Sequence, residues 1–378
     1  MYKRQPSYGL YTINTYQLFE SLAVSGAEPG RGWGVAYRRR RPTQADVARV
    51  AGVSQAVVSY VLNDNQTVSI SPVTRQRVLD VIAELDYVPN TAARSLRSQR
   101  TATIAAIIPD IANPYYPTFV RGIQDVARAQ GFDVLTYNTD GKRDLEHHAL
   151  DAARRGRVDG LILTPFHLTV DDLLPILGEG TPITLLSEMR VDGDAAAHLP
   201  LDSVSVSGEL AAREVVNYLI DRGHTHIGMI AGQSSTPPRE TRVLGYRRAL
   251  AEHHLPLEEL LIRGGDFSEE GGYDAMRELI ALDPRPTAVF AANDLMAMGA
   301  LLAAREAGLS VPDDIALAGF DDIPAARLVH PALTTIDQQA NLSGRRAAEL
   351  LLSRLTGAFM GPHRAEHLGF RLVVRESA

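Results

Sequence analysis

Hydrophobic and polar residues follow three different patterns along this chain of 378 residues. Residues 1–42 show no sustained period of about 3.6 or 2 residues, so we expect a disordered N-terminal extension there. Residues 43–88 place apolar side chains at helical spacing, whereas residues 101–378 alternate apolar strands with helical segments. Residues 89–100 join these two parts. The pattern therefore predicts a small helical domain, a linker and a large α/β domain.

The helical part is predicted to form three helices. Thr43 begins the first helix, and Asp46 three residues later completes a pattern typical of a capping box. After Gly52 and a cap at Ser54, the second helix has two faces: apolar Val57, Val58, Val61 and Leu62, and opposite them Gln55, Ala56, Ser59 and Tyr60. The third helix begins with Ser71 as its N-cap and Pro72 as its first residue. Its apolar side chains are expected to face the core of the domain, namely Val78, Val81, Ile82 and Leu85. Two short helices around a Gly turn are typical of a helix-turn-helix, although similar hairpins occur in proteins that never touch DNA.

The linker Val88–Arg100 contains a short helical pattern. Pro89 ends the preceding helix, Asn90 is a good N-cap, and residues 91–97 suffice for about two turns. Isolated helices of fewer than roughly 12–15 residues are marginal in water. This helix is therefore expected to form only where something outside it supplies packing, which makes it a natural switch. The alternative is an ordinary interdomain linker.

The α/β part is predicted from alternating strands and helices. Apolar strand patterns occupy residues 103–108, 132–137, 158–164, 183–186, 227–231, 261–263, 288–291 and 315–319. Helical patterns separate most of them, at residues 116–130, 206–221, 241–253, 273–282 and 295–307. This order predicts mostly parallel sheets, and the two groups of strands predict two Rossmann-like lobes.

Composition indicates a soluble globular protein with an uneven charge. The chain is 45% hydrophobic, has no run of 18 or more apolar residues and lacks the order of a signal peptide, so we expect a cytoplasmic protein without a membrane partner. The absence of Cys excludes disulfides, thiolate metal sites and Cys nucleophiles.

The charge is unevenly distributed along the chain. The net charge is -7, but residues 38–100 carry ten Arg and five acidic residues, a net +5, whereas residues 101–378 carry -13. A basic head on an acidic body is typical of a phosphate-binding module attached to a domain that does not bind nucleic acid.

The chain resembles the LacI/GalR family of bacterial transcriptional regulators in two stretches, ADVARVAGVSQAVVSYVLN at residues 45–63 and SPVTRQRVLDVIAELDYVPNTAARSLRS at residues 71–98. The resemblance extends from about Thr43 to the end of the chain. It implies that the second helix lies in the major groove of DNA, where Gln55 can pair with adenine. The positions in and around this helix that match DNA-contacting residues are Thr43, Ser54, Gln55, Ala56, Val57, Ser59, Tyr60 and Asn63.

Two of these positions depart from the common family pattern. Val57 stands where Thr is usual, and Tyr60 stands where Arg is usual. Because an Arg would favour guanine, we expect Tyr60 to contact a thymine methyl group or a phosphate instead.

The resemblance also implies a role for the linker. Linker helices from two subunits would enter the minor groove, with Leu96 as a wedge that opens a central base step. The matching residues are Asn90, Ala93, Arg94, Leu96 and Arg97. A plain interdomain contact is the alternative for Leu96.

For the α/β part the resemblance implies a periplasmic-binding-protein fold with a ligand cleft at the carboxyl ends of the strands. The chain is expected to cross between the lobes three times, with the last crossing returning residues 333–338 and the next helix to the first lobe. Residues at strand ends or at family effector positions are Tyr115, Tyr116, His167, Arg242, Asn293, Asp321 and Gln338. The neighbouring Asp294 is expected to be a helix N-cap.

These residue types suit a sugar or a related effector. Tyr rings can stack on a sugar ring or a base, the guanidinium of Arg242 suits paired hydroxyls or a carboxylate, and Asp321 can accept from vicinal hydroxyls. The structural alternatives are turn or core positions for the Tyr residues, a surface His and an exposed helix charge. Ser187–Met189 and Ser203 differ from the common family pattern, which indicates that the ligand is not a typical one.

The function expected from these features is an effector-controlled repressor. It would bind double-stranded operator DNA of pseudopalindromic sequence as a homodimer, without a cofactor or metal. No heptad pattern follows residues 370–374, which favours a dimer over a tetramer. The alternatives are an α/β enzyme and a solute-binding protein with the same body. The sequence contains no G-x-G-x-x-G after a strand, no P-loop and no H-E-x-x-H motif, which argues against an enzyme.

Overall fold

The computed structural model describes residues 40–62, 68–88, 100–187 and 199–378. The chain divides into two units, Met1–Asn90 and Thr91–Ala378, and the division falls inside the predicted linker. Some of the predicted DNA contacts lie outside the described residues, namely Asn63, Asn90, Ala93, Arg94, Leu96 and Arg97. Within the described ranges, no helix combines the length and the apolar character needed to span a bilayer.

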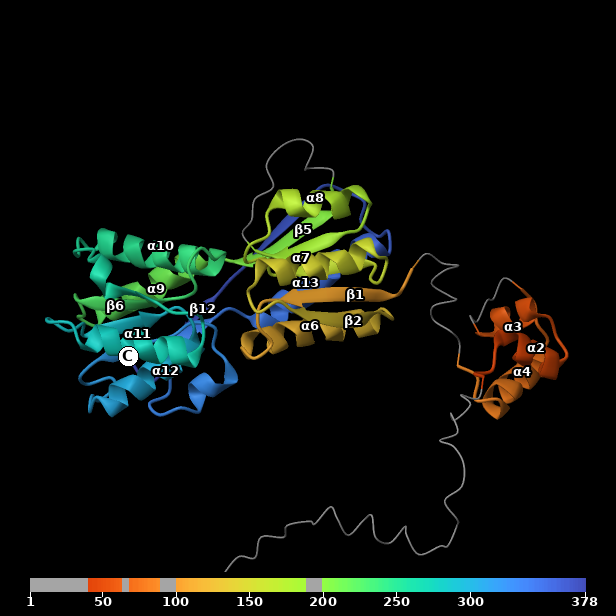
Figure 1. Ribbon diagram of the computed structural model, residues 1–378, viewed down its shortest axis with the longest axis horizontal. Helices are drawn as coiled ribbons and strands as arrows, with labels where there is room; N and C mark the ends of the chain where they lie inside the picture. The colour runs from red at the N-terminus through yellow and green to blue at the C-terminus, as the bar shows by residue number, and fades with distance from the viewer. Residues whose placement is uncertain (1–39, 63–67, 89–99, 188–198) are drawn as a thin grey trace, which may run out of the picture. The chain divides into compact units, whose positions relative to one another are not determined.

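The first unit consists of the three predicted helices, α2 (Gln44–Ala51), α3 (Gln55–Leu62) and α4 (Pro72–Glu84) (Figure 1). The capping box is confirmed, because the Thr43 hydroxyl accepts from Asp46 N while the Asp46 carboxylate accepts from Thr43 N. Gly52 ends α2 at φ 66°, a left-handed conformation that suits Gly. The core of the unit is built from apolar residues of all three helices, among them Val47, Val58, Val61, Val78 and Val81.

The first lobe of the second unit is built on a six-stranded parallel sheet in the order β11-β5-β4-β3-β1-β2. Its strands are β1 (Thr103–Ile108), β2 (Asp133–Asn138), β3 (Gly160–Leu163), β4 (Ile183–Leu186), β5 (Leu201–Val206) and β11 (Arg364–Leu368). The predicted strands are confirmed within a few residues. β5 was not predicted, because its buried positions include the polar residues Asp202, Ser203 and Ser205. The helix predicted from Val206 begins instead at Gly208.

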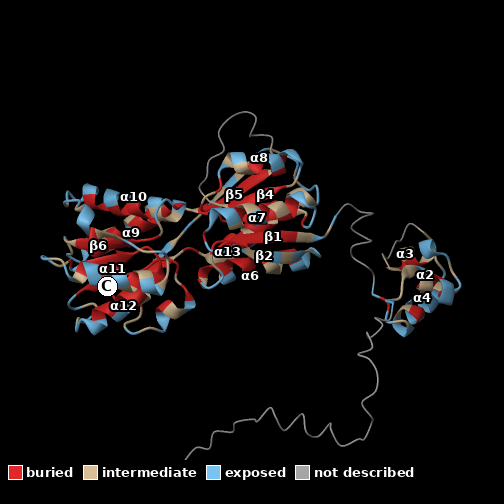
Figure 2. Ribbon diagram, viewed as in Figure 1, coloured by how far each residue is buried: buried red, intermediate tan, exposed pale blue. Residues whose placement is uncertain are grey.

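Helices cover both faces of this sheet (Figures 1 and 2). One face packs against α6 (Tyr115–Ala129) and α13 (Ala340–Leu355), and the other packs against α7 (Arg143–Arg154) and α8 (Val170–Gly178). Because both faces are covered, β1 carries apolar side chains on both and shows no alternation with polar residues. α6 and α13 approach so closely that a Cβ atom on Gly344 would lie 2.0 Å from the Phe119 carbonyl oxygen.

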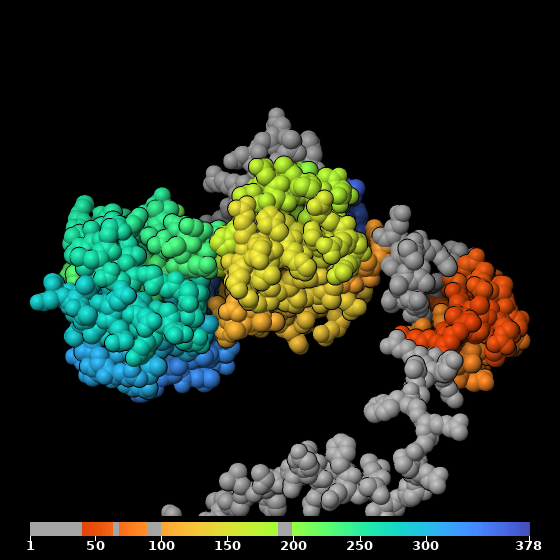
Figure 3. All heavy atoms as spheres, viewed as in Figure 1, coloured from red at the N-terminus to blue at the C-terminus, as the bar shows by residue number. Residues whose placement is uncertain are grey.

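The second lobe is built on a four-stranded parallel sheet in the order β7-β6-β8-β9. Its strands are β6 (Ile227–Ala231), β7 (Ile262–Gly264), β8 (Ala288–Ala291) and β9 (Ala316–Ala318). Its helices are α9 (Gly208–Asp221), α10 (Pro237–Glu252), α11 (Glu269–Ile280) and α12 (Asp294–Glu306), with short 3₁₀ turns η2 (Glu259–Leu261) and η3 (Pro324–Arg327). In the space-filling view the two lobes are adjacent masses with a seam between them (Figure 3).

The chain crosses between the lobes three times, as predicted, but the last crossing lies at a different place in the sequence from the one predicted. It leaves the first lobe after β5 and returns after β10 (Thr335–Asp337) to form α13. A third crossing then follows β11, because β12 (Arg371–Val373) pairs antiparallel with β10. Ser377 finally accepts a hydrogen bond from Leu317 N of β9. The prediction that the crossing at residues 333–338 is the last one is therefore wrong.

Candidate functional site

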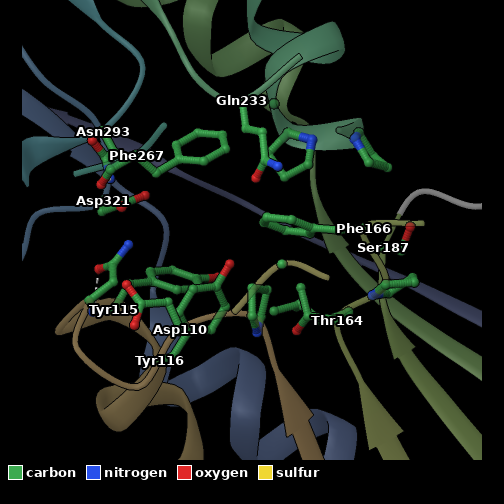
Figure 4. A pocket seen from close by; sticks show the side chains of 18 of the residues that line it. Asp110, Tyr115, Tyr116, Thr164, Phe166, Ser187, Gln233, Phe267, Asn293 and Asp321 are labelled. Atoms are coloured by element: carbon green, nitrogen blue, oxygen red, sulfur yellow. Dashed lines mark hydrogen bonds between the residues drawn. The ribbon is translucent and has the colours of Figure 1, made fainter. Parts of the chain in front are cut away.

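A cavity of about 710 Å³ lies between the two lobes of the second unit. The cavity lies at the carboxyl ends of strands, where the family resemblance implied a cleft. Residues that follow strands line it from both lobes: Asp110 follows β1, Thr164 follows β3, Gln233 follows β6 and Asn293 follows β8. Figure 4 shows these side chains directed toward a common space. Of the seven predicted effector residues, six line this cavity: Tyr115, Tyr116, Arg242, Asn293, Asp321 and Gln338.

A buried charged cluster lies at the second lobe's side of the cavity. Arg242 Nη2 lies 3.7 Å from Asp321 Oδ1, and Gln338 donates from Nε2 to the same oxygen at 2.6 Å. A second guanidinium nitrogen of Arg242 donates to the Ala292 carbonyl, and the Arg242 guanidinium stacks on Phe320 with 4.0 Å between its Cζ atom and the ring centroid. Arg242 is 8% exposed, so it is not the exposed helix charge that was the structural alternative.

The electrostatics of Asp321 reflect this burial. Burial raises the pKa of Asp321 to about 6, while Arg242, Gln338 and Asn113 act against the increase by favouring the charged carboxylate. The backbone of Asp321 has a φ of 116°, in the region that residues other than Gly rarely adopt. Such strain is common where a side chain is held in place for binding.

The aromatic side chains of the cavity form two groups. Tyr115 and Tyr116, at the start of α6, meet edge to face with ring centroids 5.2 Å apart. Burial raises the pKa of both Tyr hydroxyls, so they stay protonated at neutral pH. Phe166 of the first lobe and Phe267 of the second lie with centroids 6.1 Å apart, a separation at which aromatic rings attract each other.

The N-cap of α12 is Asn293 and not Asp294, so that prediction was wrong. The Asn293 side-chain oxygen accepts from Met296 N, and its amide nitrogen donates to the Phe267 carbonyl. Asp294 is instead fully buried one residue further, where it accepts from Ile323 N. Burial and the nearby charge of Asp321 raise the pKa of Asp294 well above its usual range.

His167 is the one predicted effector residue that does not line the cavity. Its ring nitrogen Nε2 lies 2.8 Å from the carbonyl oxygen of Gly141, a residue that does line the cavity. Its backbone N–H donates to Glu146, as does that of Phe166, at 3.0 and 2.7 Å. The buried Glu146 carboxylate thus holds the loop after β3, and this loop presents Phe166, rather than His167, to the cavity.

Several residues of the cavity were not predicted from the sequence. Thr164, Phe166, Gln233 and Phe267 each follow a strand, and that position alone was a usable signal for them. Asn113 lies two residues before the predicted Tyr115, but its contact with Asp321 arises only from folding. Among the described residues, no group of His, Asp and Glu is arranged to hold a metal ion.

The first unit exposes part of the predicted DNA-contacting face. Gln55 and Ala56 of α3 are exposed, whereas Ser59 and Tyr60 are half-buried. The Ser54 hydroxyl accepts from Val57 N at 3.3 Å, which fits its predicted role at the start of α3. Gln44 of α2 donates to the Gln55 carbonyl at 3.0 Å and so joins the two helices of the motif.

Comparisons with known proteins agree with this architecture. The model of the lacI family of bacterial regulatory proteins matches residues 43–90, and that of the periplasmic binding protein-like domain matches residues 216–378. The transcriptional regulator CelR of Thermobifida fusca is 37% identical over 349 residues, which cover 90% of this chain and 99% of that protein. Catabolite control protein A of Priestia megaterium is 36% identical, over 81% of this chain and 90% of that protein.

Among solved structures, a lac repressor dimer bound to operator and an anti-inducer matches with a TM-score of 0.77 and 29% identity, over 89% of this chain and 99% of that one. The chain has the same two units as these regulators and is similar to them over nearly their whole length. It therefore belongs to the LacI family of bacterial transcriptional regulators.

Proposed function

We propose that this chain is a repressor that binds a pseudopalindromic operator as a homodimer in the cytoplasm and responds to a sugar or sugar derivative. The observation that carries the proposal is the presence, in one chain, of a helix-turn-helix unit with an exposed α3 face and a second unit whose lobes enclose a cavity with a buried Arg–Asp pair. No part of this site requires a catalytic step, and the relatives are regulators. We therefore propose a regulatory role and not an enzymatic one.

The chemistry of the cavity supports a polyhydroxylated effector. A hydroxyl both donates and accepts, so one sugar hydroxyl can donate to the Asp321 carboxylate while a neighbouring hydroxyl accepts from Arg242 or Gln338. The rings of Tyr115 and Phe166 offer apolar surface to the C–H face of a sugar ring. A solved CelR complex with cellobiose, 35% identical and with a TM-score of 0.65 over 89% of this chain and 100% of that one, supports the same class.

Effector control follows from the position of the cavity between the lobes. A ligand that contacts both lobes binds more tightly to one angle between them than to another, and therefore shifts their equilibrium. We propose that this shift moves the two attachment points of the linkers in a dimer and removes the packing that keeps residues 91–97 helical. By thermodynamic linkage, operator DNA must change effector affinity by the same factor.

The test combines two assays on the purified full-length protein. A thermal-shift screen of small molecules identifies ligands, and a gel shift against genomic fragments then measures operator binding with and without each one. The expected result is sequence-specific binding that a ligand weakens or strengthens. Absence of DNA binding would favour a solute-binding protein or an enzyme, and an effector affinity that is the same with and without operator would exclude allosteric control.

Leu96 is proposed to open a central base step of the operator. Leu96→Ala should then weaken specific binding far more than non-specific binding, because non-specific binding depends mainly on phosphate contacts. Competition assays at controlled salt concentration measure both, with Arg97→Ala as the phosphate-contact control. An equal loss of the two affinities would contradict the wedge.

Tyr60 is proposed to contact a thymine methyl group or a phosphate. Tyr60→Arg should then shift the preference at one operator position toward guanine, because Arg pairs bidentately with guanine. Binding to a set of operators with systematic base changes measures the preference. An unchanged preference at every position would refute a base-reading role for this residue.

A further inference from the structure

The helix-turn-helix unit has no net positive charge of its own. Residues 42–88 carry three Arg and five acidic residues, a net charge of -2. Four consecutive Arg residues, Arg38–Arg41, raise the net charge of residues 38–88 to +2, and three further Arg lie in the linker. Neutralisation of phosphates by Arg and Lys supplies the sequence-independent part of DNA affinity. The four residues Arg38–Arg41, which we call the arginine run, therefore decide the sign of the charge that this unit brings to DNA.

The arginine run directly precedes the first helix of the unit. Arg40 and Arg41 are exposed, and the match to the lacI family begins after them, at residue 43. The capping box fixes the beginning of α2, and Gln44 donates to the Gln55 carbonyl at 3.0 Å, so the beginning of α2 lies against the beginning of α3. Because a chain spans at most about 3.6 Å per residue, Arg41 lies within about 11 Å of Gln44. The run therefore ends near the exposed Gln55, which is expected to contact DNA.

The surroundings of Arg40 favour an anion. The amino ends of α2 and α3 carry partial positive charge from their backbone N–H groups. Asp46 is the one acidic residue among residues 38–62, against five Arg. Its carboxylate accepts from the backbone N–H and the hydroxyl of Thr43 and lies 3.7 Å from Arg40 Nη2. The Arg40 side chain is 79% exposed, and ion pairs as exposed as this one are weak, so Arg40 can exchange the carboxylate for a phosphate.

The length of the run suits the dimensions of DNA. Arg38 is six residues before Gln44, so an extended chain can place it up to about 20 Å from that residue. The major groove is about 12 Å wide. If α3 lies in this groove, as proposed, the run can reach the phosphates that border the groove on either side. Phosphates follow one another about every 3.4 Å of helix axis along each strand, so several lie within this distance.

We propose that the arginine run is a second DNA-contacting element, which binds the phosphate groups that flank each operator half-site. This inference rests on the proposed function and adds to it a contact outside the residues that match the family. Arg binds phosphate whatever the neighbouring base. The run therefore strengthens binding to specific and non-specific DNA alike, and a dimer brings two such runs to one operator.

The test measures how DNA affinity depends on salt. The probes are an operator fragment recovered by gel shift and a duplex of unrelated sequence, each titrated with the full-length protein between about 50 and 200 mM salt. In the main variant all four Arg of the run are replaced by Gln. Each lost phosphate contact lowers the slope of log affinity against log salt by about 0.9, which amounts to about 7 for the eight Arg of a dimer.

The expected result is a slope that is shallower by about 4 or more, and an affinity that is about a hundredfold or more lower near 100 mM salt, for both duplexes. A slope and an affinity equal to those of the parent protein would overturn the proposal. A loss confined to the operator would also overturn it, because such a run would recognise sequence and not phosphate.

A Lys variant tests whether charge is the cause. Replacing all four Arg by Lys keeps the positive charges, and Lys binds phosphate as a point charge. This variant should keep most of the slope and the affinity of the parent protein. A loss as large as that of the Gln variant would contradict simple phosphate binding. Both variants leave Pro42 and the Thr43 cap in place, so their melting temperatures should match that of the parent.

The matched control removes the same number of charges from the second lobe. It replaces four exposed Arg residues by Gln, namely Arg222, Arg277, Arg305 and Arg327. The slope should stay within about one unit of the parent value, because these residues are not expected to contact phosphates. A decrease as large as that of the run variant would show that net charge alone, and not the position of the run, determines the effect.

The parent protein separates failure of this inference from failure of the proposed function. If the parent protein binds neither duplex, the proposed repressor fails and the arginine run fails with it. If the parent binds the operator specifically and the Gln variant does so with the same slope and affinity, the repressor stands and only the role of the run is wrong.

Discussion

Replacing Asp321 by Asn should change the free energy of unfolding in a way that depends on pH. Compared with the wild type, the variant should be relatively more stable at neutral pH than at acidic pH. Asp321 is 8% exposed, and burial raises its pKa from 3.8 to about 6 despite the nearby Arg242. The folded protein therefore binds a proton at this carboxyl more tightly than the unfolded chain does. Its contribution to the free energy of unfolding is fully present below about pH 4 and is lost as the pH rises toward 6.

The size of this effect follows from the two pKa values. A difference of about two pH units corresponds to about 3 kcal/mol of unfolding free energy, at about 1.36 kcal/mol per unit. Roughly half of it, about 1.4 kcal/mol, falls between about pH 5 and pH 7.5, where the protein is easier to study. In Asp321→Asn this contribution is absent, and Asn tolerates the positive φ of 116° better than most residues.

The assay is urea denaturation of both proteins at about pH 5 and pH 7.5. The difference in unfolding free energy, variant minus wild type, should increase by about 1.4 kcal/mol from the lower to the higher pH. Taking this difference cancels the titrating groups that do not interact with Asp321, and the exposed Asp313→Asn serves as the control. A difference that is constant with pH, or that decreases, would refute the idea that burial outweighs Arg242 at this site.

Two further substitutions test how the first lobe supports the cavity. Glu146→Gln leaves only one side-chain acceptor for the N–H groups of Phe166 and His167. The substitution should therefore lower the free energy of unfolding by about 1–3 kcal/mol and weaken effector binding in calorimetry. An unchanged effector affinity would show that the loop does not depend on this carboxylate. Asp202→Ala removes the carboxylate shared by the guanidinium groups of Arg354, whose side chain is 6% exposed, and Arg364, whose side chain is 25% exposed. This substitution should lower the free energy of unfolding, measured by urea denaturation, by about 3–5 kcal/mol. If the free energy falls no more than in the exposed Asp221→Ala, the cluster contributes little to stability.

The candidate site was predictable where a strand end or a family position carries a residue type that suits a sugar. Arg242 was chosen from the family pattern and Asp321 from its place after a strand, and the structure brings the two within 3.7 Å of each other. His167 was chosen by its position after a strand, but its neighbour Phe166 lines the cavity instead. The buried Glu146, on a helix far away in the sequence, holds that loop and decides which of the two side chains faces the cavity.

By itself, the sequence determined most of the helices and strands and their order in the chain, although β5, β11 and β12 were not among the predicted strands. Caps such as Thr43, helical spacing in residues 43–88 and apolar runs such as Thr103–Ile108 act over a few residues, so they can be recognised without the fold. Only the tertiary structure decided that the polar segment β5 is an interior strand of its sheet, between β11 and β4. Asp202 is stabilised there by Arg354 and Arg364, more than 150 residues away in the chain, and a pairing over that distance leaves no local pattern. The same holds for the cavity, since its two walls come from separate sheets that only folding brings together.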